Sequence, residues 1–208
     1  CGRSEAAIRA AAAPVLALLS RLAPRAVALG RVSLATLFVP GFVVRCREVP
    51  PAVGVRLLVA NNREQLVAMM DAGEADLSIM GRPPKEIATR SESFAAHPLV
   101  FISPPDHPLA GIGQFPVAAL GHYPLIAREP GSGTRDAMQR FFAAHRFEPR
   151  IAMDMSSNET IKQAVMAGLG LSFVSLHTIG LEVGNRLLHV LDVEDTPVMR
   201  VWNVVRLH

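Results

Sequence analysis

The stretch "GVRLLVANNREQLVAMMDAGEADLSIMG" (54–81) decides the fold class of this chain. Residues 54–60 form a short apolar run bounded by turn residues, which is typical of a buried strand. Asn61 and Asn62 can cap the next segment, whose apolar residues recur at helical spacing until a glycine ends it. Residues 75–81 form a second apolar run. The stretch therefore predicts a strand, a capped helix and a strand, the repeating unit of an α/β protein.

The second half of the chain repeats this order. Residues 150–155 and 169–175 are predicted to be strands, and the segment between them has the apolar spacing of a helix. Ser156 and Glu159 have the S-x-x-E spacing of a capping box at the start of that helix. Strand–helix–strand order is common to all α/β proteins, so the repetition has that ordinary explanation too. The alternative is two similar lobes, each a small open α/β sheet.

The remaining elements are predicted from the same signals: helices at 4–22, 40–50 and 134–145, and strands at 31–38, 97–104, 123–127, 186–191 and 197–205. Two lobes joined by crossing strands would leave a cleft between them. Ligands of open α/β sheets bind beyond the carboxyl ends of strands, near helix N-termini. The helix starts near Asn61, at 128–134 and at 156–158 are therefore expected to face this cleft.

The composition argues against several other classes of protein. The chain has 208 residues, of which 50% are hydrophobic, and its net charge is +3. This size allows one large domain or two small ones, and so weak a charge does not by itself indicate nucleic-acid binding. Cys1 and Cys46 cannot form a disulfide framework, which favours a reduced, cytoplasmic setting. The apolar start of the chain is interrupted by Pro14, Arg21 and Pro24, so we expect no membrane span.

The stretch "REPGSGTRDAMQRFF" (128–142) is a glycine-rich loop that runs into a helix. It lacks the lysine and the spacing of a nucleotide-binding P-loop, and it matches neither G-x-G-x-x-G nor G-x-S-x-G. A helix N-terminus that carries Ser132, Thr134 and Arg135 can nevertheless bind a carboxylate or a phosphate. The alternative is a capped helix that binds nothing. We favour anion binding.

The sequence predicts no catalytic residue and no metal site. The 7 histidines are scattered without H-x-x-x-H or H-E-x-x-H spacing, and Cys46 has no cysteine neighbour. No close pair of carboxylates suggests general acid–base chemistry. We therefore expect that the chain is not an enzyme and needs no cofactor.

Four segments, in this order and spacing, resemble one protein family: "GVRLLVANNREQLVAMMDAGEADLSIMGRPP" (54–84), "HPLVFISPPDHPLA" (97–110), "LIAREPGSGTRDAMQRFF" (125–142) and "SNETIKQAVMAGLGLSFVS" (157–175). Together they resemble the effector-binding domain of LysR-type transcriptional regulators, from about Gly30 to Val205. Within that family they are similar to the subgroup that controls carbon-fixation (Calvin-cycle) operons.

The resemblance implies an α/β fold of the type II periplasmic-binding-protein-like class, with two α/β lobes joined by crossing hinge strands. On this basis residues 1–29 would be a truncated linker helix. Residues 30–96 and 199–208 would form lobe I, and residues 97–198 would form lobe II. A winged helix-turn-helix DNA-binding domain would precede residue 1, and DNA would be bound only through it.

The resemblance also implies a small anionic effector in the interlobe cleft and a homodimer or homotetramer in the cytoplasm. For the carbon-fixation subgroup the expected effectors are a sugar phosphate, a phosphoglycolate-type acid or NADPH. Arg135 and the loop amides would hold the anion, hydroxyls would orient it, and Arg82 would report closure. The expected effector-binding residues are Thr36, Asn61, Arg82, Ser132, Gly133, Thr134, Arg135, Ser157 and Asn158.

Three other functions remain open. A solute-binding lipoprotein of the same fold could be anchored through Cys1. An enzyme on this fold would need a titratable cluster in the cleft, which the sequence does not suggest. The segment "LATLFVP" (34–40) is shorter than the family's Ser/Thr-rich tract and keeps only Thr36, which would fit a regulator that oligomerises without a ligand.

Overall fold

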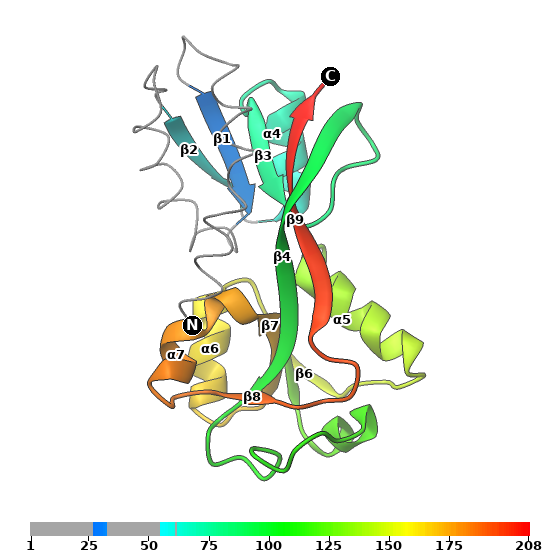
Figure 1. Ribbon diagram of the computed structural model, residues 1–208, viewed down its shortest axis with the longest axis vertical. Coiled ribbons are helices and arrows are strands. Elements are labelled where there is room, and N and C mark those ends of the chain that lie inside the picture. The colour runs from blue at the N-terminus through cyan, green and yellow to red at the C-terminus, as the bar shows by residue number, and fades with distance from the viewer. Residues whose placement is uncertain (1–26, 33–54, 61) are drawn as a thin grey trace. The chain divides into compact units, whose positions relative to one another are not determined.

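The computed structural model describes residues 27–32, 55–60 and 62–208. Thr36, Asn61 and the helices predicted at 4–22 and 40–50 lie outside these residues. The chain divides into two compact units, residues 1–97 with 200–208, and residues 98–199. Each unit has its own helices and strands (Figure 1). The two α/β lobes predicted for this chain are therefore present, and each is described by itself.

The first unit is built on a sheet with a parallel centre. Its elements are β1 (Val27–Val32), β2 (Val55–Ala60), α4 (Arg63–Asp71), β3 (Leu77–Met80) and the second part of β9 (Val198–Leu207). Strand β1 lies between β2 and β3 and is parallel to both, while β9 runs antiparallel to β3. The helix α4 begins as predicted, because the Asn62 side chain accepts a hydrogen bond from the Gln65 amide at 2.9 Å.

The start of the first unit differs from the prediction. Strand β1 begins at Val27, so residues 27–29 belong to the sheet and not to the linker helix expected over residues 1–29. Ala28 and Leu29 are buried, and every residue of β1 is in register with one of β2. An alanine-rich segment favours a helix locally, and the parallel strand beside it overrides that preference. The strand predicted at 31–38 overlaps the described part of β1 only at residues 31 and 32.

The second unit repeats the arrangement of the first. Its strands are β4 (Thr89–Ser103, in part), β5 (Leu125–Arg128), β6 (Ile151–Met155), β7 (Leu171–Ser175) and β8 (His189–Leu191). Strand β5 is parallel to its neighbours β6 and β7, and β4 runs antiparallel to β7. Both units thus have a central strand between two parallel ones and an antiparallel strand beyond them. The internal repetition in the sequence reflects this shared topology.

Helices cover both faces of the second sheet. They are η2 (Val117–His122), α5 (Gly133–Ala144), α6 (Asn158–Met166), η3 (Leu176–Thr178) and α7 (Gly180–Gly184). Successive residues of β4 point to opposite faces of the sheet. Phe101 packs in the cluster that contains Phe141 and Phe142 of α5. Ile102 packs in the cluster that contains Ile161 of α6. Figure 1 shows α5 on one side of these strands and α6 with α7 on the other.

Two local predictions need correction, and one short helix was not predicted. Strand β4 begins at Thr89 and not at residue 97. Its first half is largely exposed and carries no apolar run, so the apolar pattern did not predict it as a strand. The cap of α6 is Ser157 and not Ser156, since the Ser157 hydroxyl accepts a hydrogen bond from the Thr160 amide. The short helix α7 has no signal in the apolar pattern.

A buried lysine joins α6 to α7. The Lys162 Nζ lies 2.7 Å from a carboxylate oxygen of Glu159, 2.7 Å from one of Glu182, and 3.1 Å from the Thr178 carbonyl oxygen. Burial lowers the pKa of Lys162, but the hydrogen bonds to the two carboxylates outweigh it and the pKa is raised. Lys162 therefore stays charged, which fixes α6 against the segment that leads into α7.

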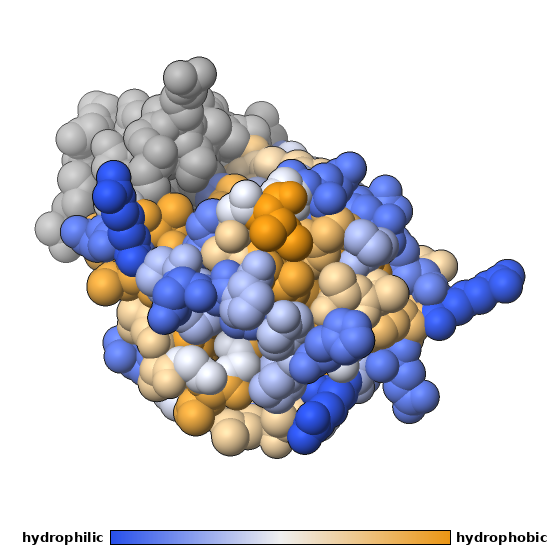
Figure 2. Space-filling view, turned by 90° about the horizontal axis from the view of Figure 1, so that it is seen from below, coloured by the Kyte–Doolittle hydropathy of each residue, from blue (hydrophilic) through white to orange (hydrophobic). Residues whose placement is uncertain are grey.

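The described surface is mixed in character. Its large exposed hydrophobic side chains include Ile112, Leu181, Leu187 and Met199. On the face shown in Figure 2, hydrophobic groups are separated by hydrophilic ones. In the part of the chain that the structure describes, no helix is both long and apolar enough to cross a membrane.

Replacement of Gly170 by alanine should destabilise the second unit. A Cβ at this position would lie 2.5 Å from the carbonyl oxygen of Pro124, which accepts a hydrogen bond from the Leu171 amide. Backbone would have to move, so urea unfolding should show a loss of about 1–3 kcal/mol for Gly170→Ala. Gly184→Ala is the control, because a Cβ there meets nothing within 4 Å. Equal stability of the two variants would contradict the prediction.

Replacement of Lys162 by methionine should also destabilise the chain, because it leaves Glu182 largely buried without its cation. We expect a loss of about 1.5–3 kcal/mol in urea unfolding, the usual contribution of a hydrogen bond to a charged group. Glu159→Gln is the control. Its side chain is 72% exposed, so the loss should stay below about 1 kcal/mol. Loss of stability in the control alone would contradict this account.

Candidate functional site

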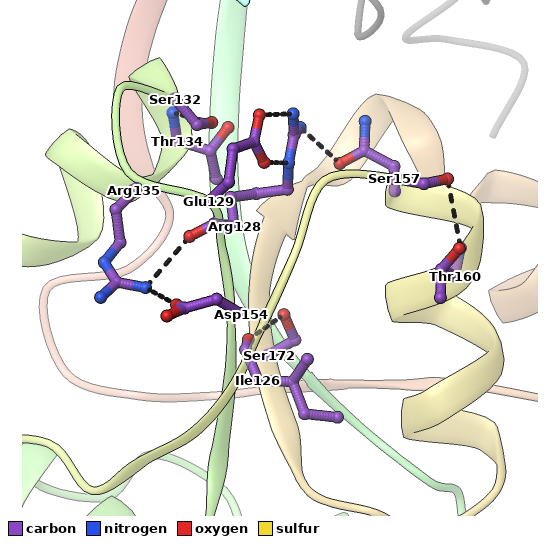
Figure 3. A network of polar contacts seen from close by, with 11 residues as sticks. Ile126, Arg128, Glu129, Ser132, Thr134, Arg135, Asp154, Ser157, Thr160 and Ser172 are labelled. Atoms are coloured by element: carbon purple, nitrogen blue, oxygen red, sulfur yellow. Dashed lines mark hydrogen bonds and ion pairs between the residues drawn. The ribbon is translucent and has the colours of Figure 1, made fainter. Parts of the chain in front are cut away.

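The candidate site lies where α5 and α6 begin, in the second unit. Strands β5 and β6 are parallel neighbours, and the last residue of β5, Arg128, pairs with the last residue of β6, Met155. Their carboxyl ends therefore meet at one edge of the sheet, which is where open α/β sheets bind ligands. The loop after β5 leads into α5 and the loop after β6 leads into α6 (Figure 3). Both helices direct their first amides toward this edge.

The loop before α5 holds two buried hydroxyls. Ser132 caps the helix, because its Oγ accepts a hydrogen bond from the Thr134 amide at 3.3 Å. Gly131 permits the turn with a φ of 82°. Ser132 is 5% exposed and Thr134 is 2% exposed, yet the Thr134 Oγ1 has no hydrogen-bond partner among the described residues. An unsatisfied buried hydroxyl is costly, so it marks a position where a ligand acceptor would be stabilised.

A buried arginine links this loop to α6. Arg128 is 3% exposed, and its Nη1 donates a hydrogen bond to the Asn158 Oδ1 at 3.0 Å. Its Nε and Nη2 donate to the two carboxylate oxygens of Glu129, at 2.7 and 2.8 Å. In Figure 3 the guanidinium and the carboxylate stand between the Ser132–Thr134 side and the start of α6. Arg128 thus brings the two helix starts together.

Arg135 makes a different set of contacts. Its guanidinium forms an ion pair with Asp154 of β6 and donates a hydrogen bond to the Arg128 carbonyl oxygen at 3.0 Å. Figure 3 shows the side chain directed toward Asp154, away from the guanidinium of Arg128. Arg135 therefore ties α5 to β5 and β6. That Arg135 holds an anion stays a prediction; in the structure its Nη1 contacts Asp154 and the Arg128 carbonyl oxygen.

The other residues expected to bind an effector fall into three groups. Gly133 is the first residue of α5, and Ser157 and Asn158 lie at the start of α6, so these three belong to the candidate site. Arg82 lies in the first unit, where it is exposed and its carbonyl accepts a hydrogen bond from Arg63. Thr36 and Asn61 lie outside the described residues.

Arg128 and Glu129 were not among the expected effector-binding residues, although the loop 128–134 was expected to face the cleft. The strand was predicted to end at residue 127, which placed Arg128 in the loop and left its burial unnoticed. The available signal was a cation at the carboxyl end of an apolar strand, directly before a carboxylate and a glycine turn. Side chains at the end of a strand are buried more often than those of a loop. A predicted strand that ended at Arg128 would therefore have indicated a buried arginine at this position.

The arrangement suits binding better than bond breaking. It offers one buried guanidinium, two buried hydroxyls and the amides of two helix starts, all of which stabilise an anion. Across residues 27–32, 55–60 and 62–208, no group of three or more His, Cys, Asp or Glu side chains could hold a metal ion. The site described so far can hold a carboxylate or a phosphate.

Comparison with known proteins supplies the family. The model of the LysR substrate binding domain matches residues 26–208. The HTH-type transcriptional regulator CfxR of Cupriavidus necator is 41% identical over 181 residues, which is 87% of this chain. The RuBisCO operon transcriptional regulator of Allochromatium vinosum is 46% identical over 173 residues, or 83% of the chain. The chain spans 57% of the length of each of these two relatives.

Solved structures agree with the sequence matches. The regulatory domain of CcmR from Synechocystis, in complex with 2-PG, is 38% identical with a TM-score of 0.82, and the match covers 88% of each chain. The cofactor-binding domain of the Cbl transcriptional regulator has the same fold, with a TM-score of 0.77 at 20% identity, over 88% of this chain and 80% of that one. The match to the family model extends over nearly the whole chain. The chain therefore belongs to the LysR substrate binding domain family.

Proposed function

We propose that this chain is the effector-sensing part of a LysR-type transcriptional regulator and that it binds a small anionic metabolite at the starts of α5 and α6. The observation that carries the proposal is the unpartnered Thr134 hydroxyl, which is 2% exposed, in the loop that follows the buried Arg128. Arg128 would bind the anionic group, and the hydroxyls of Ser132 and Thr134 and the amide of Gly133 would orient it. Asn158 would hold Arg128 in place.

A phosphate is the anion that fits these donors best. A guanidinium forms two parallel hydrogen bonds with phosphate oxygens, and a helix start adds about 0.3–1 kcal/mol to a nearby anion, or up to about 2 when it is partly buried. The CcmR regulatory domain was solved with 2-PG, which supports a phosphoglycolate-type acid as the first candidate. Sugar phosphates and NADPH carry the same kind of group. The relative named for the RuBisCO operon supports carbon-fixation genes as the target.

In the full-length protein, the metabolite would change DNA binding by favouring one of two conformations. A ligand can shift such an equilibrium only by the difference between its affinities for the two states. DNA would be contacted by a winged helix-turn-helix domain outside this chain, in a homodimer or homotetramer in the cytoplasm. Thr36, Asn61 and Arg82 of the first lobe would add contacts to the effector or report its arrival.

A solute-binding protein of the same fold is the second candidate. The relatives described above are named as transcriptional regulators, at 41% and 46% identity over more than four fifths of this chain. This favours the regulator. The proposed role is non-catalytic and requires no cofactor.

The first test is calorimetry of the chain with 2-phosphoglycolate, ribulose bisphosphate and NADPH. The Arg128→Lys variant should bind the preferred effector at least about tenfold more weakly, because an ammonium replaces a two-pronged donor with a single point of contact. Arg140→Lys on the exposed part of α5 is the control and should match the wild type. If the Arg128→Lys variant bound the effector as tightly as the wild type, Arg128 would not be the residue that binds the anionic group.

The second test concerns the hydroxyl of Thr134. The Thr134→Val variant keeps the shape of the side chain and removes the donor, so effector affinity should fall about fivefold to tenfold, or about 1–1.4 kcal/mol. Thr160→Val, at an exposed position of α6, should leave the affinity unchanged. Because the Thr134 hydroxyl has no partner to lose, the thermal stability of the ligand-free Thr134→Val variant should not decrease. A variant that is less stable but binds normally would show that the hydroxyl serves folding alone.

A further inference from the structure

The guanidinium of Arg128 already donates hydrogen bonds to a carboxylate of the chain itself, that of Glu129. Both oxygens of Glu129 are engaged, at 2.7 Å from Nε and at 2.8 Å from Nη2. This is the two-pronged arrangement that a guanidinium makes with a carboxylate or a phosphate of a ligand. In the view of Figure 3 the Glu129 carboxylate is drawn between the Arg128 guanidinium and the side chains of Ser132 and Thr134. The carboxylate thus lies where the anionic group of an effector would be bound.

We propose that Glu129 is an internal stand-in for the effector and that the anionic group of the effector displaces it from Arg128. The inference rests on the proposed function, since it concerns the same site. It makes Glu129 a residue that determines which anions bind, although Glu129 itself makes no favourable contact with them.

The burial of Arg128 explains why a stand-in is needed. A guanidinium that is 3% exposed cannot be left without a counter-charge, because burial of an unpaired cation is strongly unfavourable. Asn158 supplies a neutral acceptor at Nη1 only. Glu129 supplies the negative charge while the site is empty, and an incoming anion takes over this role.

The backbone of Glu129 is fixed, while its side chain has access to water. The Glu129 amide donates a hydrogen bond to the Met155 carbonyl oxygen, and the Glu129 carbonyl accepts one from the Ser132 amide, both at 3.2 Å. The Glu129 side chain is 22% exposed, against 3% for that of Arg128. Rotation of one side chain into solvent therefore suffices for the exchange, and the loop that carries Ser132 and Thr134 keeps its position.

The exchange selects anions by charge. A monocarboxylate offers Arg128 no more charge than Glu129 does, so it gains little by replacing it. A phosphate dianion offers more charge and a third oxygen, which can accept a hydrogen bond from the free Thr134 hydroxyl. The ligand class that this site admits is therefore a phosphorylated metabolite, and common carboxylic acids are excluded.

The test compares Glu129→Gln with wild type in calorimetric titrations of 2-phosphoglycolate, inorganic phosphate and glycolate. Glutamine keeps the size of the side chain and removes the competing charge, so we expect 2-phosphoglycolate and phosphate to bind about tenfold more tightly. Glu159→Gln is the matched control: it removes one negative charge from the start of α6, at a side chain that is 72% exposed and paired with Lys162. Its effect on affinity should stay below about twofold.

The outcomes separate this inference from the proposed function. Tighter binding in Glu129→Gln alone, or binding in that variant where the wild type shows none, supports the displacement. Wild-type binding with an unchanged or weaker Glu129→Gln would overturn it and leave the proposed function intact, since Glu129 would then be a bystander or a ligand contact. An equal gain in Glu159→Gln would also overturn it, because the effect would be one of net charge. Binding by neither protein to any of the three anions would overturn both.

Discussion

The parallel pairing of β5 with β6 is the constraint on which the candidate site depends. It places Arg128 opposite Met155, so that both loops leave the sheet at one edge and both helices start there. The Ser172 hydroxyl donates a hydrogen bond to the Ile126 carbonyl at 2.7 Å, which also fixes β7 to β5 from the other side. Arg128, Ser132 and Thr134 are buried, whereas the side chain of Glu129 is 22% exposed. The proposed anion site therefore combines buried donors with one partly exposed acceptor.

Much of the fold could be predicted from the sequence because the buried strands and the amphipathic helices have strong local patterns. The capped helix after Asn62 and the apolar face of α5 follow directly from spacing, whereas the two-lobe organisation was implied by the family resemblance and left open by the repetition. The start of β1 and the first half of β4 could not be predicted in this way. The start of β1 follows an alanine-rich segment and pairs with β2, while the first half of β4 is polar and exposed, so its strand character comes from pairing and not from burial.

The residues that the candidate site brings together could be predicted only in part. The glycine turn, Ser132, Thr134 and the start of α6 could be chosen because helix N-termini have recognisable signals. The choice between Arg128 and Arg135 could not be made, because it depends on which guanidinium meets Asp154 and which meets Glu129. The Arg135–Asp154 pair joins a helix to a strand, and the pairing of Arg128 with its neighbour Glu129 depends on the direction of both side chains, so a single sequence records neither. The proposed role of Glu129 rests on that direction.

The division of the chain has a consequence for the order in which its parts can be completed. The second unit is one continuous segment, 98–199, whereas the first unit needs residues 200–208, which contribute the strand that borders β3. During synthesis on the ribosome, the residues that carry Arg128, Thr134 and Asn158 are all available before that last strand emerges. The unit that carries the candidate site can therefore assemble first, and the other unit is completed by residues 200–208.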